Sequence, residues 1–499
     1  MALDLKQASL PDDHAVLADL QCNTLAPHRR NLSVHLFFNL GPDAGKNRKY
    51  LQDWAQRATP MSAQIREENI RREARNKSIA QGLAAASWMT KAARTFESFF
   101  APGLAAVRYR QELTGILEKF WQQEDPARRL VKSVMLSSSG LRKLPPWSTG
   151  IGSPVVPVND RPWRVGMFDY EPSLAANGNG HQQNWLPPFF DPATPGVRQT
   201  VDVHVILAAD GAAQPGAAQP QPTAELLQAI ADEKKFIAEA GGTERGERWG
   251  YLCRHPEGGF QEHFGFRDGI SNVHVLDGEI ANAQKQFSSP PAGTTLENLL
   301  YEFKLPSGQV AYGTLCVLRQ IEENLANAAA MTAALVGRKA DGTPLVAATS
   351  WDGFNFTADA AAPPPLPACP FHAHIRKANP RGTSNELNES AVLLARRGML
   401  YGSRAYDHQT RTFGAAPGAV GLLFIGYMAK IEKQFVRMQK TWLAPSLFPR
   451  HATQADAFIG DPSLKHPANL TKMRGGEYFF VPPLSWLQDP RESPQPPRP

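Results

Sequence analysis

Residues 201–254 read VDVHVILAADGAAQPGAAQPQPTAELLQAIADEKKFIAEAGGTERGERWGYLCR, and this stretch decides the fold class. Val201–Ala209 is an apolar, β-branched run, which predicts a buried strand. Ala224–Ala240 carries the amphipathic period of a helix, and Trp249–Arg254 predicts a further strand. Strands separated by helices are typical of layered α+β proteins. The sequence therefore predicts an α+β fold.

The same pattern extends in both directions from this stretch. Toward the N-terminus, strands are expected at Ser33–Leu40 and Val134–Ser139, and two or three helices at Gln64–Trp121, which we expect to pack or to form an oligomer contact. Toward the C-terminus, strands are expected at Val310–Leu318, Ala391–Arg397 and Gly421–Met428, the last followed by an amphipathic helix at Lys430–Trp442. The second half resembles a repeat of the first. We therefore expect two domains, 1–245 with a helical insertion at about 64–121, and 246–499.

Composition narrows the class of protein. The 499 residues are 42% hydrophobic, so the chain can bury a large core. The net charge of +6 comes from 53 basic and 47 acidic residues without a long basic block, so no nucleic-acid partner is expected. The four cysteines lie far apart, which favours neither a disulfide framework nor a four-thiolate zinc site. The acidic start MALDLKQASLPDDHAVLADLQ and the lack of an apolar run of about 18 to 20 residues predict a cytoplasmic protein without a membrane partner.

Gly265–Ser271, GFRDGIS, is the first segment that could carry chemistry. Its glycines would let the backbone approach a flat ligand closely, with the enclosed carboxylate of Asp268 directed into the space. The structural alternative is a plain turn, because Asp-Gly is a common turn dipeptide.

Cys369–Gly382, CPFHAHIRKANPRG, is the second segment. His372 and His374 stand two residues apart, which favours one of them alone as a ligand, and imidazole is the usual axial ligand of haem iron in peroxidases. Arg376, Lys377 and Arg381 could neutralise two propionates, although three cations also describe a solvated face.

Leu393–Gly402, LLARRGMLYG, is an apolar strand that ends in paired arginines. An arginine beside a bound peroxide would polarise the O–O bond, whereas the structural alternative is a solvated strand end. A zinc site from Cys253, His255, Cys369 and His372 has suitable ligand types, but the segments lack a recognised finger spacing.

Taken together, these segments resemble the dye-decolourising (DyP-type) haem peroxidase family, in one of its larger forms. GFRDG matches the GxxDG signature, CPFHAHIRKANPR the proximal-histidine segment, ARRGMLYG the distal-arginine segment, and GLLFIGY followed by KIEKQF the last core strand and helix. Weaker matches are LQCNTL with HLFFNL near the start, and FIGDP and GGEYFFVPP near the end.

The resemblance implies the fold, the cofactor and the residue roles. The fold would be two ferredoxin-like domains with antiparallel sheets flanked by helices, similar to a dimeric α/β barrel, with haem b in the C-terminal domain. His374 would be the iron ligand, Asp268 the distal acid, Arg396 the distal arginine with Arg397 as the fallback, and Arg381 the propionate partner. The remaining cofactor contacts would come from the glycine-rich segment and from the last core strand, namely Gly265, Phe266, Arg267, Gly269, Leu422 and Phe424.

One position departs from the family pattern. An acidic residue often hydrogen-bonds the proximal histidine from the strand-to-helix segment, but Lys430 stands where it is expected, and Glu432 is the substitute that the sequence offers.

The implied activity is oxidation of dyes, phenols and other aromatic substrates by hydrogen peroxide through an oxoferryl intermediate. Asp268 would carry the proton between the peroxide oxygens, and an ordinary carboxyl pKa of about 4 predicts an acidic optimum. Bulky dyes would pass electrons through Trp442 or Tyr427. The alternative is a haem-handling protein, for storage or iron removal, with incidental peroxidase activity; a homo-oligomer is compatible with both.

Overall fold

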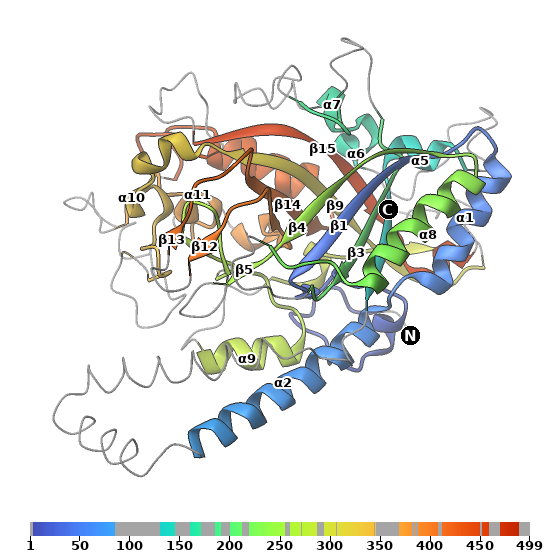
Figure 1. The fold of residues 1–499 in the computed structure, drawn as a ribbon, viewed down its shortest axis with the longest axis horizontal. Helices are drawn as coiled ribbons and strands as arrows, with labels where there is room; N and C mark the ends of the chain where they lie inside the picture. Colours follow the sequence, from blue (N-terminus) through green and yellow to red (C-terminus); the bar gives the residue numbers. More distant parts are fainter. Residues whose placement is uncertain are drawn as a thin grey trace.

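The computed structural model describes residues 3–84, 130–144, 160–170, 185–190, 200–211, 219–254, 260–270, 272–286, 294–305, 307–343, 345, 369–381, 384, 388–407, 412–449, 452–458 and 470–488. Within these residues, one antiparallel sheet closes on itself (Figure 1). Following the hydrogen bonds around the closed sheet, the strands are β14 (Gly421–Met428), β11 (Met399–Tyr401), β4 (Thr243–Tyr251), β1 (Leu32–Asn39), β3 (Val203–Ala209), β2 (Val131–Leu136), β15 (Thr471–Val481) and β9 (Val310–Glu323). The pairing of β14 with β9 completes the barrel.

Short strands extend or accompany this barrel. β10 (Ala395–Arg396) pairs with β14 and β8 (Tyr301–Lys304) pairs with β9. Two small sheets lie apart from it, one of β5 (Cys253–Arg254), β6 (Phe260–Gln261) and β7 (Arg267–Asp268), the other of β12 (Tyr406–Asp407) and β13 (Thr412–Phe413).

The sheet contains each predicted strand, but several have other bounds. The strand predicted at Val134–Ser139 is β2, which ends at Leu136, and its last two residues begin α5. The strand predicted at Trp249–Arg254 begins earlier, as β4, and the one predicted at Val310–Leu318 extends to Glu323 as β9.

Nearly every residue of β1, β3 and β14 is buried or half-buried, as expected for strands that are covered on both faces. β14 has the predicted bounds, whereas the predicted strand Ala391–Arg397 shortens to β10 after a helical turn at η8 (Glu389–Val392). A shared hydrophobic core runs from Leu3 to Leu487, so strands from both halves of the sequence pack into one interior.

Helices cover the barrel on several sides. α1 (Ala44–Arg57) and α8 (Ala224–Glu239) lie side by side, and the Tyr50 hydroxyl donates to Glu233 at 2.5 Å (Figure 1). Shorter helices are α5 (Ser138–Arg142), α6 (Arg161–Val165), α7 (Met167–Tyr170), α10 (Ala333–Val336), α11 (His374–Ala378) and α12 (Leu484–Gln488), with 3-10 turns at η1 (Ala15–Ala18), η5 (Leu296–Asn298) and η6 (Leu325–Ala330). None of the helices in the described residues combines the length and apolar composition that crossing a bilayer requires.

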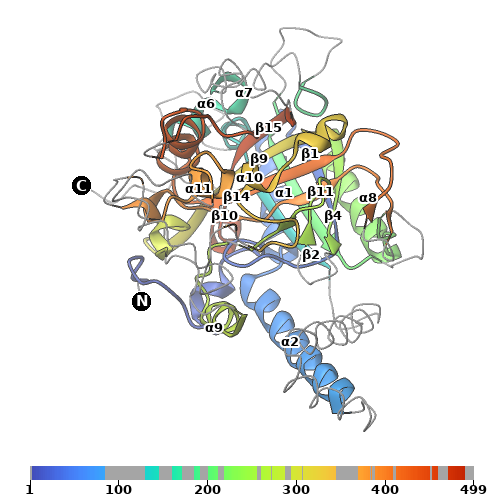
Figure 2. The same ribbon diagram turned by 90° about the vertical axis from the view of Figure 1, so that its left-hand side faces the viewer.

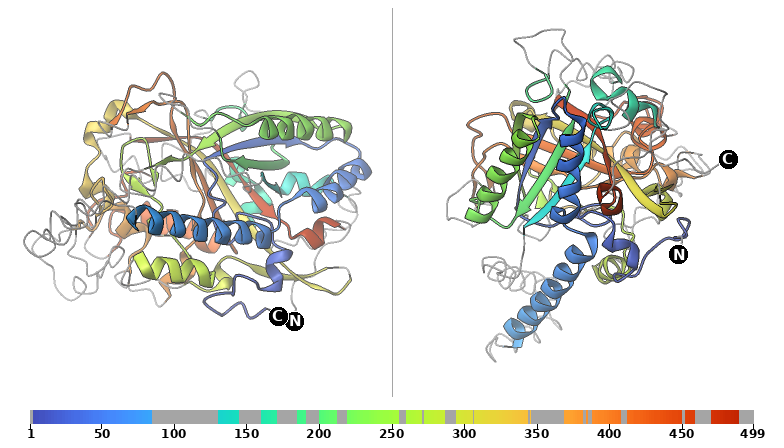
Figure 3. Two further views of the ribbon diagram at one scale, coloured as in Figure 1. Left: turned by 60° about the horizontal axis from the view of Figure 1, so that its bottom comes forward. Right: turned by 90° about the vertical axis from the view of Figure 1, so that its right-hand side faces the viewer.

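Two predicted helical stretches differ in detail. Lys430–Trp442 is helical, but as two π-helical segments, η9 (Glu432–Val436) and η10 (Met438–Leu443). The stretch Gln64–Trp121 begins as α2 (Met61–Ala84), and its remainder lies outside the described residues. α2 projects from the barrel and runs beside α9 (Asp277–Gln286), as Figures 2 and 3 show.

The division near residue 245 falls within β4, which pairs with β1 on one side and with β11 on the other. The α+β class and the closed sheet are confirmed. The division into two ferredoxin-like domains stays a prediction.

Candidate active site

His374 is the first residue of α11, and its imidazole is held by one strong hydrogen bond. Its Nδ1 lies 2.7 Å from Oδ2 of Asp456, whose side chain is fully buried. The other carboxylate oxygen of Asp456 accepts the backbone N–H of Phe458 at 2.9 Å. A carboxylate on Nδ1 favours the tautomer with a lone pair on Nε2. Nε2 makes no hydrogen bond within the described residues and the side chain is 29% exposed, so this nitrogen is available to a metal.

Asp456 was missed by the sequence reasoning, and Glu432 as the substitute was wrong. Glu432 donates its backbone N–H to Asp160, and the Lys430 N–H donates to Gln434. Asp456 lies 82 residues beyond His374 in the chain, so no local spacing connects them. The one available signal was that Asp456 lies two residues before Phe458, the first residue of the FIGDP segment.

The three cations that follow His374 have different surroundings. Arg376 and Lys377 are buried, the first donating to the Cys369 carbonyl and stacking on Phe371, the second donating to three backbone carbonyls. The expectation that these two neutralise propionates is therefore wrong, because their charged groups bind protein carbonyls in the interior. Arg381 is partly exposed and donates to the Asn379 carbonyl at 3.1 Å.

The GFRDG segment forms the turn and second strand of a hairpin between β6 and β7. Gly265 and Gly269 have φ of +93° and +75°, in the left-handed region that favours glycine. Apart from its own chain neighbours, a Cβ at either position would meet no atom of the described residues within 4 Å. The glycines are thus required by the backbone conformation, and the space next to them is open. Phe266, Arg267 and Asp268 between them are all partly exposed.

Asp268 forms an ion pair with Arg396. Oδ1 of Asp268 lies 3.6 Å from Nη1 of Arg396, and the two side chains are 42% and 37% exposed. Arg397 points elsewhere: it is buried and donates to the carbonyls of Leu25 at 2.7 Å and Asn23 at 3.4 Å. An acceptor for protons and a permanent cation therefore stand together at a surface that a ligand can reach.

Leu422 and Phe424 lie on β14, next to β10. Both are partly buried and alternate with the buried Leu423. Arg396 pairs with Gly426, and a Cβ on that glycine would lie 3.3 Å from the Phe424 ring. The Phe424 side chain is therefore close to the strand position that carries Arg396.

The histidine and carboxylate segments approach each other through two sets of contacts. Phe264 and Phe458 pack into the same small apolar cluster with Leu335 and Leu470, and the Phe458 ring meets His374 edge-on at 5.2 Å. The loop after α10 touches both sides: a Cβ on Gly337 would strike Ile375, and one on Gly342 would strike Ile270 and Arg267. Figures 1 and 2 place α10 and α11 together at one end of the barrel.

The donor set suits an iron porphyrin. One imidazole nitrogen is free while its partner nitrogen is held by a carboxylate, which is the arrangement of a metal-binding histidine. The space beside Gly265 and Gly269 is open, and the polar pair of Asp268 and Arg396 borders it. The described residues contain no cluster of three or more metal-ligating side chains, so the zinc alternative has no support there; His255 lies outside them.

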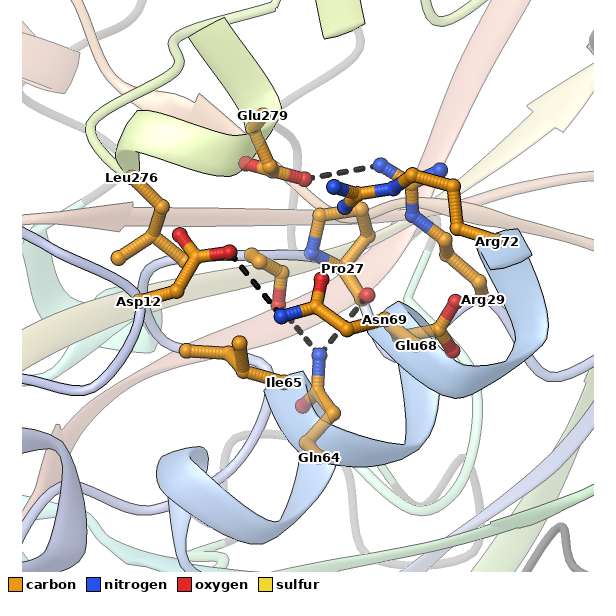
Figure 4. Close-up of a pocket in the computed structure, with 11 residues that line it drawn as sticks. Asp12, Pro27, Arg29, Gln64, Ile65, Glu68, Asn69, Arg72, Leu276 and Glu279 are labelled. Atoms are coloured by element: carbon orange, nitrogen blue, oxygen red, sulfur yellow. Dashed lines mark hydrogen bonds and ion pairs between the residues drawn. The ribbon is translucent and has the colours of Figure 1, made fainter. Parts of the chain in front are cut away.

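Away from this site, a pocket lies between α2, α9 and the N-terminal segment, and it is lined mainly by charged and polar groups (Figure 4). Its cavity volume is about 20 Å³, which is enough for a water molecule and far too small for a macrocycle.

Comparison with known proteins relates this chain to dye-decolorizing peroxidases. The family model "Dyp-type peroxidase, C-terminal" matches residues 262–485. The multifunctional dye peroxidase DyP2 of Amycolatopsis sp. is 29% identical over 349 residues, covering 58% of this chain and 71% of the relative. The dye-decolorizing peroxidase msp1 of Mycetinis scorodonius is 31% identical over 290 residues, covering 46% and 56%.

Solved structures share the fold. The DyP-type peroxidase of Anabaena sp. superposes with a TM-score of 0.68 at 23% identity, covering 97% of this chain and 98% of that one. The structure of DyP2 from Amycolatopsis gives a TM-score of 0.67 at 23% identity, covering 97% and 100%. The family match over residues 262–485 and the curated relatives support a Dyp-type peroxidase, an oxidoreductase, and the solved structures show that the chain shares the fold of such enzymes.

Proposed function

We propose that this chain uses hydrogen peroxide to oxidise dyes, phenols and other aromatic compounds with haem b bound in its C-terminal half. Two observations carry the proposal: Asp268 pairs with Arg396 at 3.6 Å, and the Nδ1 of His374 is occupied by Asp456. We further propose that the two halves are ferredoxin-like domains, because each contributes four neighbouring strands to the barrel.

Nε2 of His374 would hold the iron, and the carboxylate of Asp456 would strengthen its donation. Arg381 would pair with a propionate, and Gly265, Phe266, Arg267, Gly269, Leu422 and Phe424 would border the ring. When bound, the haem would supply a coordination position for the peroxide and the electrons that cleave its O–O bond.

The polar pair would handle protons and charge. Asp268, as a carboxylate, would accept a proton from one peroxide oxygen and return it to the other, so that water leaves. Arg396 would stabilise the negative charge that develops on the departing oxygen. Arginine suits this role because it is always charged and offers several N–H donors, so it needs no change of protonation.

Reducing substrates would deliver electrons one at a time. Tyr427 and Trp442 are both fully buried, so neither can touch a bulky dye directly. A relay through either residue stays a prediction, and it requires a further donor at the surface. Leu422 and Phe424 are apolar, which would favour small aromatic molecules near the haem edge.

The test separates a peroxidase from a protein that only handles haem. Asp268→Asn and Arg396→Leu should slow peroxide cleavage by about 100-fold to 10,000-fold while the Soret band of bound haem persists. Glu239→Gln, whose side chain is 60% exposed on α8, is the matched control and should change neither. Stopped-flow spectroscopy with one equivalent of peroxide measures the rate. Retention of the full rate in both variants would refute the proposed roles and favour haem handling.

A further inference from the structure

Glu262 occupies the turn of the hairpin that presents Asp268. Its Oε1 accepts the backbone N–H of Phe266 at 2.6 Å, and its Oε2 accepts that of Phe264 at 2.7 Å. Its own backbone N–H donates to the Phe266 carbonyl at 3.0 Å, and its carbonyl accepts the N–H of Gly265 at 2.9 Å. One residue thus makes four hydrogen bonds within a single turn.

These bonds define where β7 begins. Gln261 is paired with Arg267 and Phe260 with Asp268, so the turn between them is the five residues from 262 to 266. If the carboxylate of Glu262 released the two amides, the turn would lose the contacts that fix its shape, and Asp268 is two residues beyond Phe266. The hydrogen bonds of Glu262 therefore help to fix the position of the Asp268 carboxylate, although Glu262 itself takes no part in the proposed chemistry.

A second carboxyl group meets Glu262 from the barrel. Glu323, the last residue of β9, is buried and hydrogen-bonds the Glu262 side chain. Two carboxyl groups can share a hydrogen bond only when one of them carries a proton. Oε2 of Glu323 is buried and accepts no N–H or O–H of the described residues, which suits a carboxyl group that is neutral.

The surrounding charges favour a shared proton. Asp268 adds negative charge, Arg404 adds positive charge, and Tyr251 and Tyr401 are phenols whose own pKa is raised by burial. Burial, followed by the neighbouring carboxylates, raises the pKa of Glu323, and burial also raises the pKa of Glu262. Arg404 lowers the pKa of Glu323 and offsets only part of this effect.

We propose that Glu262 is a positioning residue for Asp268 and that it is held in place by a proton shared with Glu323. The assignment of Asp268 as the distal acid rests on the proposed function, whereas the ordering of the turn does not. As pH rises, the pair loses its proton, two negative charges face each other, and the turn loosens. The loss of turn order should therefore set an alkaline limit to peroxide cleavage.

The direct test is hydrogen–deuterium exchange of the peptide that spans residues 262–268 in the haem-loaded protein, with rates corrected for the intrinsic effect of pH. Glu262→Gln keeps one acceptor oxygen of two, so the turn should exchange about 10-fold faster at every pH. Glu323→Gln places a permanent amide donor opposite Glu262, so protection should persist to higher pH than in the wild type. Glu239→Gln should match the wild type throughout.

The pH profile of peroxide cleavage is the second measurement. Glu323→Gln should move the alkaline limit upward, which a purely structural role of Glu323 would not do. Glu262→Gln should lower the rate by about 10-fold to 100-fold while haem stays bound. Unchanged exchange in Glu262→Gln, or an alkaline onset in Glu323→Gln equal to that of the wild type, overturns the proposal. If exchange behaves as expected but Asp268→Asn keeps the full rate, the proposed function fails while the ordering of the turn by Glu262 stands.

Discussion

Asn272 connects the two polar residues of the site. Its Oδ1 accepts the backbone N–H of Arg396 at 3.1 Å, and its Nδ2 donates to the Arg396 carbonyl at 2.9 Å. The side-chain amide thus pairs with Arg396 as a neighbouring strand would. Because Asn272 is four residues beyond Asp268, one segment of chain carries the carboxylate and fixes the backbone that carries the guanidinium.

Asn272→Ala removes both hydrogen bonds, and we expect peroxide cleavage to slow by about 10-fold to 100-fold with haem retained. Asn272→Asp keeps the acceptor oxygen and loses the N–H donor, so its rate of peroxide cleavage should lie between those of the wild type and Asn272→Ala. Stopped-flow absorbance measures these rates at equal haem content. A wild-type rate in Asn272→Ala would show that Arg396 needs no such support.

A separate prediction concerns the negative charge of Asp456 beside His374. Asp456→Asn can still accept from Nδ1 of His374 but loses the negative charge, so the imidazole becomes a weaker donor to iron. We expect a more positive Fe(III)/Fe(II) potential in spectroelectrochemical titration and haem affinity lower by about 10-fold. Glu239→Gln serves again as the control. An unchanged potential would mean that the charge of Asp456 does not reach the metal.

Among the elements, α9 is joined to the N-terminal segment by charged groups. Arg29 Nη2 lies 2.9 Å from Glu279 Oε1, and His274 Nδ1 lies 3.4 Å from Glu279 Oε2. Asn69 on α2 donates to Asp12 (Figure 4). Asp12 also accepts the backbone N–H of Gly278 on α9. Glu279 on α9 thus binds Arg29 of the N-terminal segment, and its side chain is only 6% exposed.

Glu279 should make the protein sensitive to acid. Burial opposes its ionisation, but the hydrogen bond to His274 and the charge of Arg29 outweigh burial and lower the pKa from 4.5 to about 2. A depressed carboxyl pKa stabilises the fold above the unfolded value of 4.5, and this contribution is lost as pH falls toward 2. The shift corresponds to at most about 3 kcal/mol.

Glu279→Gln should therefore lower the free energy of unfolding at pH 7 by about 2 to 3 kcal/mol, measured by urea denaturation. Its stability should also depend less on pH between 5 and 3 than that of the wild type. Equal pH slopes in the two proteins would show that Glu279 is not the titrating group.

The elements were more predictable from the sequence than their contacts. β1, β3, β14 and α8 follow from local apolar runs and helical periods, which a chain carries wherever it folds. The bond of His374 to Asp456 joins residues 82 apart, and the bonds of Asn272 to Arg396 join residues 124 apart. Such pairs depend on how strands close into a barrel, so only the family resemblance pointed to the site.

At the scale of the whole molecule, the two halves of the barrel meet at two short strand pairings, which we call seams. β2 meets β15 through the single registered pair Leu136 and Phe480, and β4 meets β11 through Tyr251 and Leu400. Within each half the registers are much longer, for example ten pairs between β15 and β9. The two domains proposed above would separate at these seams.

Side-chain packing across these seams nevertheless predicts one unfolding transition. Leu136, Phe480, Tyr251 and Leu400 are all buried and belong to the same hydrophobic core. Exposing either half would therefore uncover apolar surface of the other, at a cost that favours cooperative unfolding. Calorimetric and van't Hoff enthalpies should agree, and far-UV circular dichroism and tryptophan fluorescence should report one midpoint.

Leu136→Ala tests this coupling from the N-terminal side of a seam. Loss of a buried leucine should cost about 2 to 5 kcal/mol, and a single cooperative unit should show that loss equally in the ellipticity of the barrel and in the Soret band of haem bound in the C-terminal half. Leu447→Ala, at a side chain that is 80% exposed, should move neither midpoint. If Leu136→Ala lowers the midpoint seen by ellipticity but leaves the Soret midpoint unchanged, the two halves unfold independently. The single residue pairs at the seams, rather than the shared core, would then govern the stability of the barrel.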